Sequence, residues 1–409
     1  MSQSAAREPV ATLPAEDEKG LRARLDQISD LLLDVSHQIH ARPETRFTEV
    51  FASGLLSQVL ADDGFSVVRP LAGLETAFSA TLDTGRPGPH VAIFCEYDAL
   101  PEIGHGCGHN VIAASGLGAA LLVKDLLLRD RALGGTLVVI GSPAEEGGGG
   151  KIPIIDSGAL DGLDAAMMLH PSGENLAGMR TLSRSGLEIV FTGRAAHAAV
   201  SPEQGVNALD AAVLTLTAIG LLRQQLPSDV RIHAIVTEGG EAQNIIPERT
   251  VLQASVRAED PRRLLDDVQV RVENCARGAA LATGAQVEIT STAPTYLSIQ
   301  PNPVLEAIVE DSYARIGRAT EPHRTDVFPG STDMGNVSQV VPTIHPNIEI
   351  VPGLTMHSRR ATELVGGGHG DVAVLDGALM LAMTAGTLFR FPEVGELVKA
   401  SFVPGVRVG

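Results

Sequence analysis

Three mostly apolar segments, bounded by helix-length stretches, constrain the fold of this 409-residue chain more than any other feature. They are HVAIFCEYD (90–98), TLVVIGS (136–142) and AAMMLH (165–170). A strand with one face in water alternates polar and apolar residues, whereas a strand covered on both faces is apolar nearly throughout. The pattern predicts an α/β fold with a largely parallel or mixed sheet between layers of helices, and such sheets bind ligands at the carboxyl ends of their strands. Further strands are expected at 65–70 and 75–83, with helices over 21–40, 49–61, 109–129, 302–317 and 371–389.

The middle of the chain changes to the order β-α-β-β-α-β. Strands are predicted at 187–193, 230–240, 250–258 and 286–293, and helices at 206–226 and 262–284. This is the order of the ferredoxin-like unit, which can fold as a compact domain. We therefore expect residues 183–295 to form a separate domain, inserted into a larger one made of 18–182 and 296–409.

Charge and cysteine content exclude several classes of protein. The chain has 31 Lys and Arg against 49 Asp and Glu, and the net charge of −18 repels nucleic acids and anionic membrane surfaces. Its first twenty residues lack a signal pattern, and no apolar run approaches the roughly 18 residues of a spanning helix. Three scattered cysteines form no disulfide framework. We expect a cytoplasmic protein with no nucleic-acid and no membrane partner.

The segment GHGCGHN (104–110) places Cys107 and His109 two residues apart among glycines. In extended chain these side chains point the same way, and a thiolate beside an imidazole suits a divalent metal such as zinc. A glycine-rich turn with a buried cysteine and an exposed histidine explains the same residues. The motif alone leaves both interpretations open.

Glu145 and Glu146 follow the predicted strand 136–142. Adjacent side chains of extended chain diverge, so one carboxylate can bind a metal while its neighbour faces the substrate. An isolated glutamate pair is otherwise common on solvated surfaces, but the position after a buried strand favours a site.

His170 ends the predicted strand 165–170, and His357 lies in TMHS (355–358). Either one alone is more simply a hydrogen-bonded histidine. Together with Cys107, His109 and Glu146 they supply five donors, enough for two metals that share a bridging group and leave a position for water. In the rival chemistry Cys107 would be a nucleophile and His109 its base. That mechanism gives Glu145, Glu146, His170 and His357 no role.

In these motifs the chain resembles metallopeptidase family twenty, a co-catalytic dinuclear group that includes aminoacylase and succinyl-diaminopimelate desuccinylase. Segments similar to its amidohydrolase branch are HARPE (40–44), EYDALP (96–101), GHGCGHN, PAEEGGGGK (143–151), MMLHP (167–171), GRAAHAAVSPEQGVNALDAA (193–212), EGGEAQNIIPE (238–248) and GSTDMGNVS (330–338). That branch holds auxin-conjugate hydrolases, aminobenzoyl-glutamate hydrolase and dipeptidases of the β-alanyl-lysine type. The resemblance implies an aminopeptidase-like catalytic domain with two metals and an inserted lid or dimerisation domain.

The resemblance also implies the metal ligands. Cys107 would bridge two divalent ions, and the shells would be completed by His109, Glu146, His170 and His357. Zinc or manganese is expected, and cobalt or nickel also suits these donors.

Other residues carry over by motif. Glu145 would be the general base, and Asp98 would orient a ligating histidine. His197 of the lid would reach the substrate, in its own or the partner subunit's site of a homodimer. Asn244 and Arg257 would hold a substrate carboxylate, although an ion pair on the lid surface explains Arg257 equally well.

Two residues depart from many relatives, which have Asp where this chain has Glu96 and Asn110. These departures resemble the dipeptidase and aminobenzoyl-glutamate side of the branch. The expected function is hydrolysis of the amide bond of an N-acyl amino acid or dipeptide by a metal-activated water. The alternative is a non-catalytic or partner-dependent subunit of a hetero-oligomeric amidohydrolase.

Overall fold

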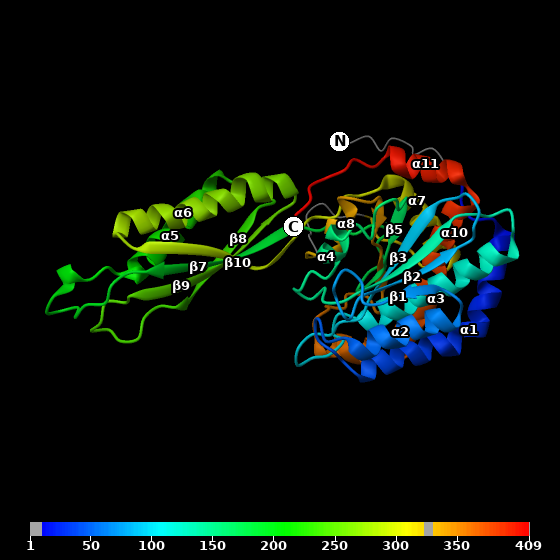
Figure 1. Cartoon of the computed structure of the whole chain (residues 1–409), viewed down its shortest axis with the longest axis horizontal. Coiled ribbons are helices and arrows are strands. Elements are labelled where there is room, and N and C mark those ends of the chain that lie inside the picture. Colours follow the sequence, from blue (N-terminus) through cyan, green and yellow to red (C-terminus); the bar gives the residue numbers. More distant parts are fainter. Residues whose placement is uncertain (1–9, 323–329, 409) are drawn as a thin grey trace.

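The computed structural model describes residues 10–322 and 330–408. Its helices are α1 (Ala15–Ala41), α2 (Val50–Asp62), α3 (His109–Arg129), α4 (Lys151–Asp156), α5 (Ala208–Leu222), α6 (Gln269–Thr283), α7 (Pro303–Arg315), α8 (Met334–Ser338), α9 (Arg359–Val365), α10 (Gly368–Arg390) and α11 (Pro392–Ala400). Its strands are β1 (Ser66–Val68), β2 (Phe78–Asp83), β3 (His90–Glu96), β4 (Thr136–Ser142), β5 (Ala165–Met167), β6 (His170–Ser172), β7 (Ser183–Thr192), β8 (Arg231–Glu238), β9 (Arg249–Ala258), β10 (Gln286–Tyr296), β11 (Thr343–Ile344) and β12 (Asn347–Glu349). Figure 1 shows a larger body built around β3 and a smaller, elongated unit that extends from it.

The larger body contains a six-stranded sheet in the order β1-β2-β4-β3-β5-β11. β3 lies parallel to both β4 and β5, whereas β1, β2 and β4 pair antiparallel. The apolar run of β3 is buried on both faces. Val91, Ile93 and Cys95 pack in the core that holds α1, α3 and α10, whereas Ala92 and Phe94 pack in a second cluster with residues of α4 and α8. The predicted α/β fold with a mixed sheet is confirmed.

Helices α3 and α10 correct one expectation. Both are long and apolar enough to cross a membrane, so the prediction that no segment reaches that length was wrong, but 83% of each apolar stretch is buried in the fold. Their glycines permit close packing. A Cβ at Gly116 would lie 2.6 Å from Cys95 Sγ, and one at Gly118 would lie 2.7 Å from Cβ of Ala378. A helix that is apolar all round is here a core helix.

The smaller unit is built on an antiparallel sheet in the order β10-β7-β9-β8. Its elements follow one another as β7-α5-β8-β9-α6-β10. Apolar residues of α5 and α6 and of this sheet form a core of their own, which includes Ile189, Phe191, Ala212 and Val272. The chain enters and leaves the unit through neighbouring strands, because β7 and β10 pair with each other.

The single strand predicted at 165–170 was wrong in one respect. The chain forms two short strands, β5 and β6, separated by Met168 and Leu169. β5 belongs to the main sheet, whereas β6 pairs with β12 in a separate two-stranded sheet. The change of partner interrupts the strand just before His170.

Candidate active site

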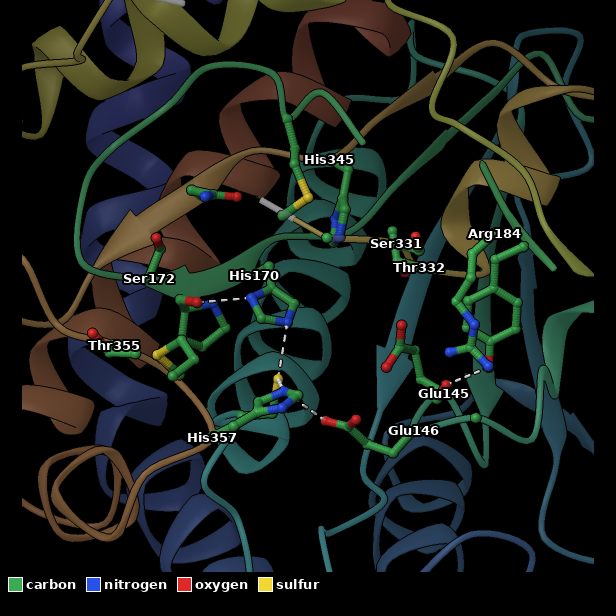
Figure 2. A pocket seen from close by; sticks show the side chains of 18 of the residues that line it. Glu145, Glu146, His170, Ser172, Arg184, Ser331, Thr332, His345, Thr355 and His357 are labelled. Carbon is green, nitrogen blue, oxygen red and sulfur yellow. Dashed lines mark hydrogen bonds and ion pairs between the residues drawn. The ribbon is translucent and has the colours of Figure 1, made fainter. Parts of the chain in front are cut away.

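A pocket of about 490 Å³ lies beside the carboxyl ends of the central strands (Figure 2). Asp98 follows β3, Glu145 follows β4, and His170 comes three residues after the end of β5. Since β3, β4 and β5 run parallel, these residues meet at one edge of the sheet. The segment from Cys107 to His109 leads into the start of α3 at the same place.

Cys107 lies at the centre of the predicted metal ligands. Its Sγ is 3.1 Å from Nε2 of His357 and 3.4 Å from Nε2 of His170. Nε2 of His357 is also 3.2 Å from a carboxylate oxygen of Glu146. Three groups of three ligand atoms lie within 4.8 Å of one another: Cys107, His109 and His170; Cys107, Glu146 and His357; and His109, Glu145 and Glu146. Two of these groups share the Cys107 thiol, and together those two contain all five predicted ligands.

Unusual backbone conformations aim these side chains. Gly108 has φ +75°, and a Cβ there would lie 2.8 Å from Cγ of Pro171. His357 and Ala144, which are not glycine, both have φ 60°. Ala144 is held by its N–H, which donates to the buried carboxylate of Glu49 over 3.0 Å. Such conformations cost free energy and persist only where surrounding contacts fix them, as they do at many active sites.

Asp98 fixes two of the neighbouring groups. One carboxylate oxygen lies 2.9 Å from Nδ1 of His109, and the other accepts the N–H of Glu146 over 2.9 Å. Nε2 of His109 is buried and has no hydrogen-bond partner in residues 10–322 and 330–408. The orientation of His109 therefore leaves one nitrogen free to bind a metal.

The charges of the cluster fit a cation. Burial would raise the pKa of Glu146, but His357 and His109 lower it below its ordinary value, while burial lowers the pKa of His170. Both side chains are thus held in the forms that bind metals. Burial raises the pKa of the Cys107 thiol, a shift that a bound cation would reverse. With sulfur, imidazole and carboxylate donors together, the residues present fit a pair of borderline divalent ions.

Glu145 lines the pocket beside this cluster. Burial first, and then the nearby Glu96 and Glu146, raise the pKa of Glu145 well above its ordinary value. The hydroxyl of Tyr296, at the end of β10, donates to the backbone carbonyl of Glu145. A carboxyl group that is reluctant to ionise and faces a cavity suits proton transfer.

A buried ion network lies behind the pocket. Nζ of Lys151, at the start of α4, pairs with a carboxylate oxygen of Glu96 and lies 2.6 Å from one of Asp333. The other oxygen of Glu96 is 3.7 Å from Nε2 of His109. No motif predicted this contact. The carboxylate of Glu96, one of the two departures, is thus paired with the lysine that ends the segment PAEEGGGGK.

The candidate residues of the smaller unit divide into two sets. Arg257 lines the pocket, and its Nη1 is 3.5 Å from Oγ of Ser331. His197 and Asn244 do not line it. They lie together in the loops at the other end of the smaller unit, where the N–H of Ala198 donates to the carbonyl of Asn244 over 3.0 Å. The chain thus does not bring His197 or Asn244 to its own Glu145 pocket.

Sequence reasoning missed several pocket residues, among them Arg184 and His345. The ring of His345 stands edge-on to that of His170 at 5.8 Å, and its Nδ1 is 2.8 Å from the carbonyl of Met168. Its signal was the repeated His-Pro pair, since both histidines precede a proline. The position of Arg184 depends on strand pairing and has no local signal.

Comparison with known proteins agrees with this geometry. The profile described as peptidase family M20/M25/M40 matches residues 92–362. The chain is 38% identical to the Xaa-Arg dipeptidase of Mus musculus over 93% of this chain and 90% of that protein. It is 36% identical to one of the subunits of the p-aminobenzoyl-glutamate hydrolase of Escherichia coli, over 69% of this chain and 62% of the relative. The crystal structure of Bacillus subtilis YXEP protein, described as a dinuclear metal binding peptidase from the M20 family, has a TM-score of 0.62 at 22% identity, covering 87% of this chain and 98% of the other.

The matched residues contain the whole cluster around Cys107, and the similarity to the dipeptidase spans nearly the full length of both proteins. The chain belongs to the peptidase family M20/M25/M40 and is a metal-dependent amidohydrolase or dipeptidase.

Proposed function

We propose that the chain hydrolyses the amide bond of a dipeptide or an N-acyl amino acid with two divalent metal ions and Glu145 as the general base. The observation that carries this proposal is the position of Cys107, which is common to two groups of three donor atoms beside the Glu145 pocket. The pocket volume of about 490 Å³ suits a small substrate of this class.

Cys107, His109, Glu146, His170 and His357 would hold the metals, either zinc or manganese, with cobalt or nickel as further possibilities. When bound, the ions polarise a carbonyl group and make a water molecule more acidic. Asp98 supports this site by fixing His109 and the backbone of Glu146.

Glu145 would move the proton. Its carboxylate accepts a proton from the attacking water and returns it to the departing amine, which is why a raised pKa is useful. Tyr296 and the strained Ala144 hold the backbone on either side of its side chain. Arg257 would bind a carboxylate of the substrate, since it faces the pocket and has no carboxylate partner in the described part of the chain.

The smaller unit, residues 183–295, would be a ferredoxin-like lid and dimerisation domain. His197 and Asn244 would act in the site of the other subunit, because they lie away from the pocket of their own chain. Among the described strands, β8 pairs with β9 alone and forms one edge of the sheet. Large apolar side chains are exposed on β8 and α5: Val213, Leu214, Leu221, Ile235 and Val236.

Sedimentation velocity tests the dimer. Wild-type protein and Leu281→Asp, whose side chain is 87% exposed on α6, should both sediment as dimers. Leu221→Asp, at an exposed position on α5, should sediment as a monomer. A wild-type monomer would contradict the dimer.

We also propose a cytoplasmic location, since all three cysteines are free thiols. The second candidate function is a partner-dependent subunit, which is favoured by the name of the Escherichia coli relative, because that name describes one subunit of a hydrolase. It would keep the metal site but need another chain for turnover.

A panel of dipeptides and N-acyl amino acids, incubated with the purified chain and zinc or manganese, tests the proposal. We expect amine release that a chelator abolishes and added metal restores. Turnover that resists chelation would refute the metal mechanism. Metal-loaded protein that cleaves nothing would favour the partner-dependent subunit.

A further inference from the structure

We propose that Arg184 and Arg257 together form a seat for two carboxylates, so that the preferred substrates release an acidic amino acid, aspartate or glutamate. This inference rests on the proposed function and names its amine product. It assigns to Arg184 a role in choosing the substrate.

The two arginines are brought together by strand pairing. Arg184 on β7 is the cross-strand partner of Arg257 on β9 and, on its other side, of Tyr296 on β10. Directly paired residues of neighbouring strands project from the same face of a sheet. All three line the pocket that holds Glu145, and the guanidinium of Arg184 lies over the ring of Tyr296 at 5.5 Å from its centroid. Figure 2 shows Arg184 on the same side of the pocket as Glu145.

Neither guanidinium is neutralised. Among residues 10–322 and 330–408, no carboxylate forms an ion pair with Arg184 or Arg257, although other arginines of the chain have such partners. Burial, followed by repulsion from Arg184, lowers the pKa of Arg257. Like charges directly opposite each other destabilise a sheet, so the pair costs stability in the free protein.

A third arginine in the same row serves as a comparison. Arg231 on β8 is the cross-strand partner of Arg257, but it does not line the pocket. Its guanidinium turns to the backbone carbonyls of Ser228 and Val230. Two of the three arginines therefore line the pocket. The third, Arg231, provides a control position for substitutions of Arg184.

Two planar cations side by side match a dicarboxylate. Each guanidinium can bind one carboxylate through paired N–H donors. One guanidinium would bind the α-carboxylate of the amino acid that is released, and Arg257 can do this by itself. The second would take a side-chain carboxylate. A lysine or arginine side chain in the same place would add a third positive charge and would be rejected.

Matched dipeptides test the assignment. The metal-loaded protein is assayed with Gly-Glu, Gly-Gln and Gly-Arg, in which glutamine keeps the shape of glutamate without its charge. We expect kcat/KM for Gly-Glu to exceed that for Gly-Gln by about tenfold or more, with Gly-Arg slower still. Arg184→Gln should lower kcat/KM for Gly-Glu more than for Gly-Gln, so that the ratio between these two substrates falls toward one. Arg231→Gln should behave like wild type.

The outcomes separate the two proposals. Equal loss on all three substrates in Arg184→Gln would overturn the inference, because both guanidiniums would then hold the one α-carboxylate. Faster cleavage of Gly-Arg by wild type would overturn it as well. If no dipeptide is cleaved, the proposed function fails, but calorimetric binding of glutamate and glutamine still tests the seat. Equal affinity for the two amino acids would refute it, and metal content and melting temperature show whether each variant is folded.

Discussion

Replacing Lys151 by Met should destabilise the protein strongly. The lysine side chain is 0% exposed, as are the carboxylates of Glu96 and Asp333 that it pairs with. Met has a similar volume and no charge, so the packing is largely kept. The two buried carboxylates, however, both lose their ion pair with Lys151. Breaking a buried ion pair by removing one partner typically costs 3–5 kcal/mol, and we expect about 4 kcal/mol at pH 8.

The loss should depend on pH in a known direction. Burial raises the pKa of Asp333 to about 6 even with Lys151 present. Without the lysine, the folded-state pKa of Asp333 rises further above its unfolded value. A raised folded-state pKa gives stability that is present below the unfolded pKa and is lost as pH rises through the folded pKa. The cost of Lys151→Met should therefore be smaller at pH 5 than at pH 8.

Urea unfolding of metal-loaded protein at both pH values measures this cost. The matched control is Lys399→Met, because Lys399 also pairs with two carboxylates, Asp164 and Glu396, but its side chain is 44% exposed. Exposed pairs contribute about 1 kcal/mol or less, so the control should unfold close to wild type. A loss below about 1 kcal/mol in Lys151→Met at pH 8 would refute the reasoning.

Three further predictions follow from the site. Glu145→Gln should keep its metal, measured by elemental analysis, and lose at least a hundredfold in kcat; wild-type turnover would rule out the general base. His197→Ala should lower kcat with metal content unchanged, and depleted metal would contradict a lid position. Burial raises the pKa of Glu49 to about 7, so its stabilising contribution is present below its ordinary value of 4.5 and lost as pH rises through about 7. Between pH 5 and pH 8, the free energy of unfolding should therefore fall by about 2 kcal/mol less in Glu49→Gln than in wild type. Equal falls in the two proteins, measured by urea unfolding, would contradict this.

The parts of the fold that follow from local pattern were predictable. The apolar run of β3 required two covered faces, and Val91 and Phe94 do pack on opposite sides of the sheet. Parallel strands bring their ends together, so Glu145 and His170 meet although they lie far apart in sequence. The limits of β5 were less predictable, because β12 pairs with β6 and divides the apolar run.

The unpredicted parts depend on contacts between distant segments. Arg184 reaches the pocket only because β7 pairs in register with both β9 and β10. Lys151 is buried because Glu96 and Asp333, at distances of 55 and 182 residues along the chain, both face it. The apolar surfaces of α3 and α10 cannot be distinguished from membrane spans by hydropathy alone, since packing inside the fold decides their surroundings.

The entry and exit of the smaller unit lie side by side, with Arg184 on the entering strand opposite Tyr296 on the leaving strand. An inserted segment whose two ends lie side by side can be replaced by the equivalent segment of a relative without moving the two parts of the larger body apart. Here Arg184 and Tyr296, the paired residues at the two ends of the smaller unit, also line the substrate pocket. The residues around Cys107 belong to the larger body. Exchange of this segment at its two ends would therefore transfer Arg184 and Arg257 and leave the residues around Cys107 in place.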